Sequence, residues 1–299
     1  MIRRIVVLCA SLALLATACA DRNAGTLGPV RGDPLPSAND EPSPRATPSG
    51  ETGSEPQYDT MSYEVWFGHG NGPWLFATER TEPFDPAIGT AALNALFDGP
   101  TEAERDVGVF TAIPLGTELL SLSIEDGLAT ADLSGEYESG GGSASMFLRL
   151  AQLTYTLTQF GSVDEVTFTL DGQPVGEFFS EAGIVLDDYM SRETWADLLP
   201  PILVQTPVVG ERAGSPITVT GTANVFEATV SISVLDAAGN EIVRTFTTAT
   251  CGTGCRGEYS EAVDYDVDRT QAGIVRVYES SAENGEPINV VEVPVTLVG

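Results

Sequence analysis

Three aspartates, Asp264, Asp266 and Asp268, alternate with other residues along the chain. Calcium-binding loops space their carboxylates in this way, but an EF-hand loop also needs Gly at its sixth position and Glu at its twelfth. Those positions hold Arg269 and Val275 here. On a strand, the same alternation would place all three carboxylates on one solvent-facing side. We therefore expect a solvated face, with a calcium site as the alternative.

The chain has one histidine, His69, within the glycine-rich sequence 68–72. A histidine can act as a general base, but it then needs a nucleophile and a positioned partner. No such partner is visible, so we expect His69 to be a turn residue between two strands. The glycines at 140–142 precede Ser143 as in a phosphate-binding loop, yet they lack the lysine and spacing of the Walker motif. They predict a flexible entry into a helix.

Cys251 and Cys255 enclose two glycines in the sequence Cys-Gly-Thr-Gly-Cys. In an exported protein a disulfide is the default state of such a pair, and the glycines allow the short loop to bend. A loop this small would stabilise the fold by about 2 kcal/mol in the chain-entropy model. A metal site would need further ligands, and His69 lies in another predicted domain. We expect a disulfide, with free thiols or a metal site as alternatives.

The first eighteen residues have the pattern of a secretory signal peptide. A basic start at residues 1–4 is followed by an apolar run at 5–15 and small residues at 16–18. The apolar run is shorter than the roughly 20 residues that a membrane-spanning helix needs. This pattern predicts export from the cytoplasm.

Residues 16–18 and Cys19 resemble the bacterial lipobox, in which the cysteine is acylated and becomes the first residue of the mature chain. Ala16 departs from the motif, because Leu is commonest there. The resemblance implies acyl chains such as palmitate on Cys19, and two or more chains at about 0.8 kcal/mol per buried methylene would anchor the protein firmly. The alternative is plain secretion, with Cys19 incidental.

The chain is strongly acidic, with 43 acidic residues, 14 arginines and lysines together, and a net charge of −29. Nucleic-acid binding depends on cations placed against phosphates, so no nucleic-acid partner is expected. Docking on anionic lipid by charge alone is disfavoured for the same reason. The acidity favours solubility outside the cell, and a basic partner or a cation is the alternative.

The composition divides the chain into segments. Half of residues 20–57 are Pro, Gly, Ser or Thr, and few are large and apolar, so this segment predicts a disordered tether. The expected organisation is a signal peptide at 1–18, the lipidated Cys19 with its linker to residue 57, a first domain at 58–177, a bridge at 178–201 and a second domain at 202–299.

The first domain mixes strands and helices without a βαβαβ rhythm, which indicates an α+β fold. Asp85-Pro86 predicts a helix start with Asp85 as the N-cap, and Gly99-Pro100 predicts its end. Apolar residues between 146 and 157 predict the buried stripe of a second helix, capped by Gly161. The expected strands are 63–67, 74–79, 118–124, 128–133 and 163–170, and the second helix is 143–160.

The second domain reads as about seven short strands separated by turn signals. This pattern indicates an all-β sandwich of immunoglobulin type. A short helix is expected at 191–199 in the bridge. The expected strands lie at Val204 and Val208 and at 217–222, 229–235, 241–248, 259–267, 274–278 and 289–298.

Several pieces of residues 58–177 resemble the GerMN domain of sporulation and spore-germination lipoproteins. They occur in the family's order: 92–96 with 99–104, 113–117, 127–134, 152–158, 163–166 and 170–172. Residues 202–299 resemble the immunoglobulin-like domain that accompanies GerMN in bacterial lipoproteins, through 215–228 and 277–285. Members of these families are envelope or spore-associated lipoproteins, and neither domain brings catalytic residues or a cofactor with it.

These observations predict a lipoprotein anchored outside the cytoplasmic membrane, with a non-catalytic binding or scaffold role. Its expected partners are the membrane, through the lipid on Cys19, and an envelope protein or wall polymer. The alternatives are an enzyme acting on wall glycan, which would need a carboxyl group of raised pKa, and a calcium-stabilised glycan-binding module.

Overall fold

The computed structural model describes residues 59–70, 72–175 and 189–299. Cys19, the expected signal peptide and the linker lie outside the described residues. The described chain comprises a mixed α and β part, followed by a β-rich part. The expected α+β domain followed by an immunoglobulin-like sandwich is therefore confirmed.

The first sheet of the α+β domain has the strand order β2-β1-β3. β1 (Thr60–His69) and β2 (Trp74–Pro83) pair in antiparallel fashion along their whole length, and β3 (Val109–Phe110) pairs with the end of β1. Both long strands extend beyond the predicted ranges, because their antiparallel hydrogen bonding continues past residues 63–67 and 74–79.

The second sheet has the order β4-β5-β6-β7 and contains a parallel pair, β5 with β6. Asp126 (φ 50°) and Gly127 (φ 87°) form the turn between the first two strands, as their sequence predicted. The strand bounds are β4 (Leu119–Glu125), β5 (Leu128–Leu133), β6 (Glu165–Leu170) and β7 (Gln173–Pro174).

The first helix, α1 (Ile88–Asp98), starts later than predicted, with Ala87 and not Asp85 as its N-cap residue. The carboxylate of Asp85 accepts a hydrogen bond from the backbone N–H of Ala87 (2.8 Å), so it closes a turn ahead of the helix. Gly99 ends α1 at φ 82°, as predicted. A short helix that was not predicted, α2 (Glu102–Asp106), follows at once.

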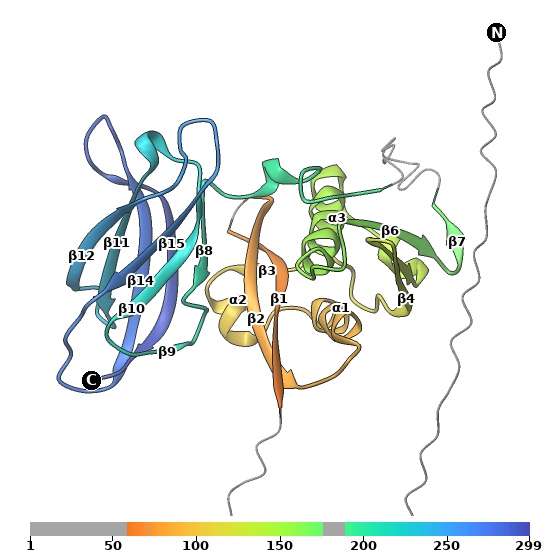
Figure 1. The fold of residues 1–299 in the computed structure, drawn as a ribbon, viewed down its shortest axis with the longest axis horizontal. Helices are drawn as coiled ribbons and strands as arrows, with labels where there is room; N and C mark the ends of the chain where they lie inside the picture. Colours follow the sequence, from red (N-terminus) through yellow and green to blue (C-terminus); the bar gives the residue numbers. More distant parts are fainter. Residues whose placement is uncertain (1–58, 71, 176–188) are drawn as a thin grey trace, which may run out of the picture. The chain divides into compact units, whose positions relative to one another are not determined.

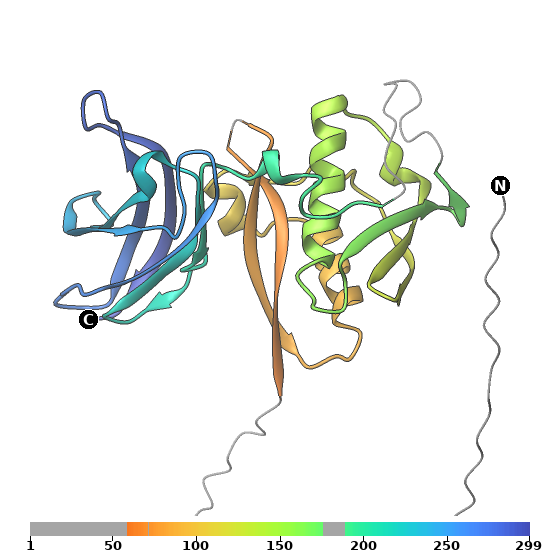
Figure 2. The same cartoon turned by 45° about the horizontal axis from the view of Figure 1, so that its top comes forward.

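The longest helix, α3 (Ser143–Leu157), ends at Thr158, and the predicted cap at Gly161 is wrong. α1 and α3 lie between the two sheets (Figures 1 and 2), and α3 packs against β1 and β6. The core of this domain gathers the buried apolar residues of all these elements, among them Phe67, Leu75, Leu93, Leu150 and Leu153. The helix predicted at 191–199 is a single 3-10 turn at Ala196–Leu198.

Two sheets form the β-sandwich of the second domain. One has the order β13-β10-β8, from β13 (Gly257–Val263), β10 (Ile217–Ala223) and β8 (Ile202–Thr206). The other has the order β12-β11-β14-β15-β9. Its strands are β12 (Glu241–Thr248), β11 (Thr229–Asp236), β14 (Gln271–Ser280), β15 (Pro287–Leu297) and β9 (Arg212–Ala213).

The sandwich core is filled by buried valines and isoleucines from both sheets, such as Val219, Ile232 and Val275. β13 ends at Val263, so Asp264, Asp266 and Asp268 follow the strand and do not lie within it as predicted. All three are exposed, while Tyr265 between them is buried and donates a hydrogen bond to the carbonyl of Ala213.

Candidate interaction site

A buried polar framework on α3 supports the candidate site. Gln152 is fully buried, and its side-chain amide accepts from the N–H of Ala112 (2.8 Å) and donates to the carbonyl of Trp66 (3.2 Å). It thereby ties residue 112 and β1 to the helix. The sequence predicts an apolar stripe here that includes Phe147, whereas Phe147 is 38% exposed and Gln152 takes a core position.

Arg149, one turn earlier on α3, is also buried. Its guanidinium donates to three backbone carbonyls, those of Ala112 (3.1 Å), Tyr137 and Gly140 (3.3 Å). Burial lowers the pKa of Arg149. Through these hydrogen bonds, Arg149 holds the loop that enters α3 against the helix. This loop forms one wall of the cavity described next.

A cavity of about 700 Å³ lies at the start of α3. The helix begins after Gly142, so the predicted role of residues 140–142 as a helix entry is confirmed. A Cβ atom added at Gly140 or at Gly70 would meet nothing within 4 Å, so open space lies beside both glycines. The lining residues are Gly70, Gly72 and Pro73, then Phe110, Thr111, Ala112 and Pro114, then Ser139, Gly140, Gly141, Ala144, Ser145, Leu148 and Arg149.

The walls of this cavity suit binding of an apolar group with a few polar contacts. Phe110, Leu148 and two prolines provide apolar surface, and Ser139, Ser145 and glycine backbone provide hydrogen-bonding groups. Pockets of this kind, mostly apolar with a few placed polar groups, are typical ligand or partner sites. Among the described lining residues, Arg149 is the one ionisable side chain.

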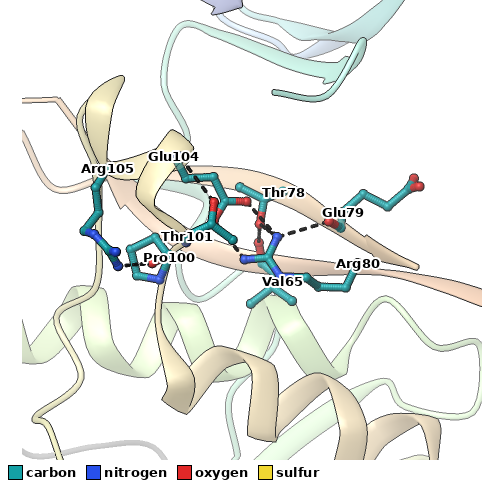
Figure 3. Close-up of polar contacts among 8 residues, drawn as sticks. All are labelled: Val65, Thr78, Glu79, Arg80, Pro100, Thr101, Glu104 and Arg105. Carbon is teal, nitrogen blue, oxygen red and sulfur yellow. Dashed lines mark hydrogen bonds and ion pairs between the residues drawn. The ribbon is translucent and has the colours of Figure 1, made fainter. Parts of the chain in front are cut away.

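An ion pair between β2 and α2 braces the same domain (Figure 3). Arg80 contacts both carboxylate oxygens of Glu104, at 2.6 and 2.8 Å. Thr101 and Glu104 complete a capping box at the start of α2, in which each side chain accepts from the other's backbone N–H. This network positions α2 on the sheet, and we assign it a structural role.

His69 lies at the end of β1 and pairs with Trp74 and Val109, so the prediction of a turn residue is wrong. Its Nε2 lies 3.0 Å from the carbonyl of Val107, and its ring stacks on Phe76 at 4.8 Å between centroids. Burial lowers the pKa of His69, so the ring is neutral at pH 7 and donates Nε2–H to that carbonyl.

The structure contains the expected disulfide between Cys251 and Cys255, whose Cα atoms are 5.7 Å apart. Within the described part of the chain, no group of three or more His, Cys, Asp or Glu residues is arranged to hold a metal ion. The exposed residues Asp264, Asp266 and Asp268 form no such group.

Among the described residues, three carboxyl groups have shifted pKa values, and in each case the pKa is lowered. Burial alone would raise the pKa of Glu104, but Arg80 and Thr101 outweigh it. Hydrogen bonds from Asn240 lower the pKa of Asp236, and a hydrogen bond from Arg244 lowers that of Glu241.

No helix among the described residues is both long and apolar enough to cross a membrane. Cys19, where the sequence predicts a lipid anchor, lies outside the described residues.

The fold defines a protein of two linked modules, an α+β domain and an immunoglobulin-like sandwich. The family model described as sporulation and spore germination (Germane) matches residues 73–176. The model described as the immunoglobulin-like domain of bacterial spore germination (Gmad2) matches residues 201–286. The chain thus carries a Germane-type domain followed by a spore-germination immunoglobulin-like domain, and neither match is to an enzyme family.

Solved structures with similarity to the chain include the first GerMN domain of the sporulation protein GerM from Bacillus subtilis. It is 24% identical, with a TM-score of 0.39, and the match covers 44% of this chain and 98% of that one. The tandem GerMN domains of the same protein are 18% identical, with a TM-score of 0.41, covering 80% of this chain and 61% of that one.

A third similar structure, described as a candidate lipoprotein from Clostridium perfringens, is 21% identical. Its TM-score is 0.33, and the match covers 45% of this chain and 89% of that one. The search of curated proteins finds no match. The assignment of the two domains accordingly depends on the two family models.

Proposed function

We propose that this protein is a lipoprotein held outside the cytoplasmic membrane, where its two domains bind a partner in the cell envelope without catalysis. The export pattern at residues 1–18, the cysteine at 19 and the tether composition to residue 57 support the location. The order of the two spore-germination domains supports an envelope role.

The observation that carries the binding role is the cavity at the start of α3. It is about 700 Å³ in volume and is walled by apolar side chains and glycine backbone. Its polar groups are hydroxyls, backbone and the buried Arg149, which suit recognition of a partner's side chain. The partner is an envelope protein or wall polymer that inserts an apolar group there.

A substitution that fills the cavity tests this role. In Ser145→Trp the indole would occupy the space beside Leu148, whereas Ser143→Trp places the same residue at the exposed first position of α3. We expect Ser145→Trp to reduce recovery of the partner from crosslinked envelopes at least tenfold, and Ser143→Trp to leave it unchanged.

Circular dichroism of both variants checks that the fold is kept. Equal recovery from Ser145→Trp and Ser143→Trp would show that the cavity does not bind the partner. Failure of the wild-type chain to recover any specific protein or polymer would contradict the binding role itself.

A further inference from the structure

Strained backbone gathers at one end of the sandwich. Glu227, Ala228 and Thr253 have positive φ values of 53°, 57° and 53°. Non-glycine residues rarely adopt this left-handed backbone, and they persist there only where the surroundings impose it. Asp126 and Asp171 also have positive φ, but they lie in ordinary hairpin turns. In the sandwich, Glu227 and Ala228 lie in the 3-10 turn Phe226–Ala228, and Thr253 lies in the loop that a disulfide closes. A fourth such residue, Asn289 (φ 51°), lies on β15.

The three strained residues lie in two loops, 224–228 and 249–256, which we call the clasp. The disulfide between Cys251 and Cys255 closes the second loop upon itself. A Cβ atom at Gly252 would lie 2.5 Å from the backbone nitrogen of Ala228, so the loops touch directly. Four hydrogen bonds join them: Thr253 N to Val225 O, Glu227 N to Thr253 Oγ1, Gly254 N to Asn224 Oδ1, and Ala249 N to Ala228 O, at 2.8–3.0 Å.

Phe226 stands in the middle of the first loop of the clasp and is 52% exposed. Its backbone N–H donates to Oε1 of Glu279 (3.0 Å), and Oε2 of Glu279 accepts from the side chain of Asn289 (2.7 Å). The backbone on both sides of the aromatic ring is therefore fixed, while the ring itself remains available to solvent.

This arrangement matches the physical requirements of an interface anchor. Aromatic residues dominate interface hot spots, and a residue that is already held in place loses little entropy on binding. A disulfide, four cross-loop hydrogen bonds and three strained residues all act on the segment that carries Phe226.

The charge around the anchor indicates the chemistry of its partner. Glu227 next to Phe226 is exposed, and the carboxylate of Glu279 contacts the backbone of Phe226. The chain as a whole carries a net charge of −29. A complementary surface would present an apolar pocket for the ring with Arg or Lys side chains at its border.

We propose that the clasp is a protein-interaction surface, with Phe226 as its anchor, for a partner protein that offers an apolar pocket bordered by basic side chains. This surface lies in a different domain from the cavity of the proposed function. The two tests share no variant, so either proposal can fail alone.

The test places the photo-crosslinking residue p-benzoylphenylalanine at position 226 of the full chain in its native membranes. The matched control carries it at Phe246, which is 67% exposed on β12 of the same domain. We expect one discrete protein adduct from position 226 that is absent from position 246. Glu227→Arg should reduce this adduct at least tenfold, because it would place like charges together.

The double variant Cys251→Ser/Cys255→Ser provides the second measurement. Hydrogen exchange should quicken at Ala249 and Thr253 while β11 stays protected, and the adduct should fall at least tenfold with the loss of the preformed loop. The proposal is overturned if no adduct forms, if positions 226 and 246 give equal adducts, or if the adduct is insensitive to Glu227→Arg. A lysozyme-sensitive smear would also overturn it, because it would indicate that the partner is wall glycan.

Discussion

Glu104 shows how single residues of the Germane-type domain are held in place. Its side chain is 7% exposed, yet the carboxylate accepts hydrogen bonds from both terminal nitrogens of Arg80 and from the backbone N–H of Thr101 (2.7 Å). Burial raises the pKa of Glu104, but these hydrogen bonds outweigh it, so its pKa lies below the ordinary value of 4.5. The carboxylate form is thus the one that the fold stabilises.

Replacement of Glu104 by Gln should lower the free energy of unfolding by about 3 kcal/mol, because it leaves Arg80 half-buried without its partner. In the wild type, the stabilisation from Glu104 is complete above pH 4.5 and is lost as the pH falls through the lower folded pKa. The variant should lack this part of the acid dependence, as measured by denaturant unfolding between pH 3 and pH 7.

The matched control is Glu241→Gln, which removes an exposed ion pair with Arg244 and should change stability little. Unfolding of Glu104→Gln with the wild-type free energy and the wild-type acid dependence would show that the ion pair does not brace α2.

At the scale of elements, local signals predicted turns well and helix ends poorly. Asp126-Gly127 required left-handed backbone, and the hairpin formed where the sequence placed it. Asp85 looked like an N-cap, but its carboxylate closes the preceding turn. α2 could have been found, because Thr101 and Glu104 have the spacing of a capping box. The burial of Gln152 could not have been predicted, because its hydrogen-bond partners are distant in sequence.

The pairing of β8 with β10 depends on a glycine that the strand pattern did not single out. At Gly221 a Cβ atom would lie 2.0 Å from the carbonyl oxygen of Leu203 and 2.6 Å from the hydroxyl of Tyr259. That hydroxyl donates to the same carbonyl (3.0 Å), so none of the three groups can move freely. The two strands can approach closely only with glycine here.

Gly221→Ala should therefore destabilise the sandwich by about 2 kcal/mol or more, because the backbone of β8 must shift. Gly214→Ala is the control, since its Cβ would meet nothing within 4 Å. Hydrogen exchange of the full chain should show faster exchange in β8 and β10 for the first variant alone. Equal protection in both variants would contradict the close approach.

The candidate site became apparent at the scale of the whole domain. Its walls come from three groups of residues that are far apart in sequence: Gly70, Gly72 and Pro73; Phe110, Thr111, Ala112 and Pro114; and Ser139, Gly140, Gly141, Ala144, Ser145, Leu148 and Arg149. These groups meet because α3 lies between the two sheets. The glycines at 140–142 predict a helix entry from local sequence, but no local pattern brings Phe110 into the same cavity. Composition and strand rhythm, which are properties of long segments, predicted the two fold classes correctly.

The whole molecule, in our proposal, is a pair of binding modules on a lipid-anchored tether. In this proposal the acyl chains at Cys19 provide the attachment, because a net charge of −29 disfavours docking on anionic lipid by charge. The cavity of the first domain and the clasp of the second then act at the distance from the membrane that the linker allows.

The most direct measurement is intact mass spectrometry combined with membrane fractionation, applied to the wild-type chain and to Cys19→Ser. We predict that the mature wild type begins at an acylated Cys19 and stays with membranes. Cys19→Ser should lack the acyl mass and leave the membrane fraction. A wild type with no fatty adduct, and a variant that fractionates in the same way, would contradict lipid anchoring and with it the proposed location.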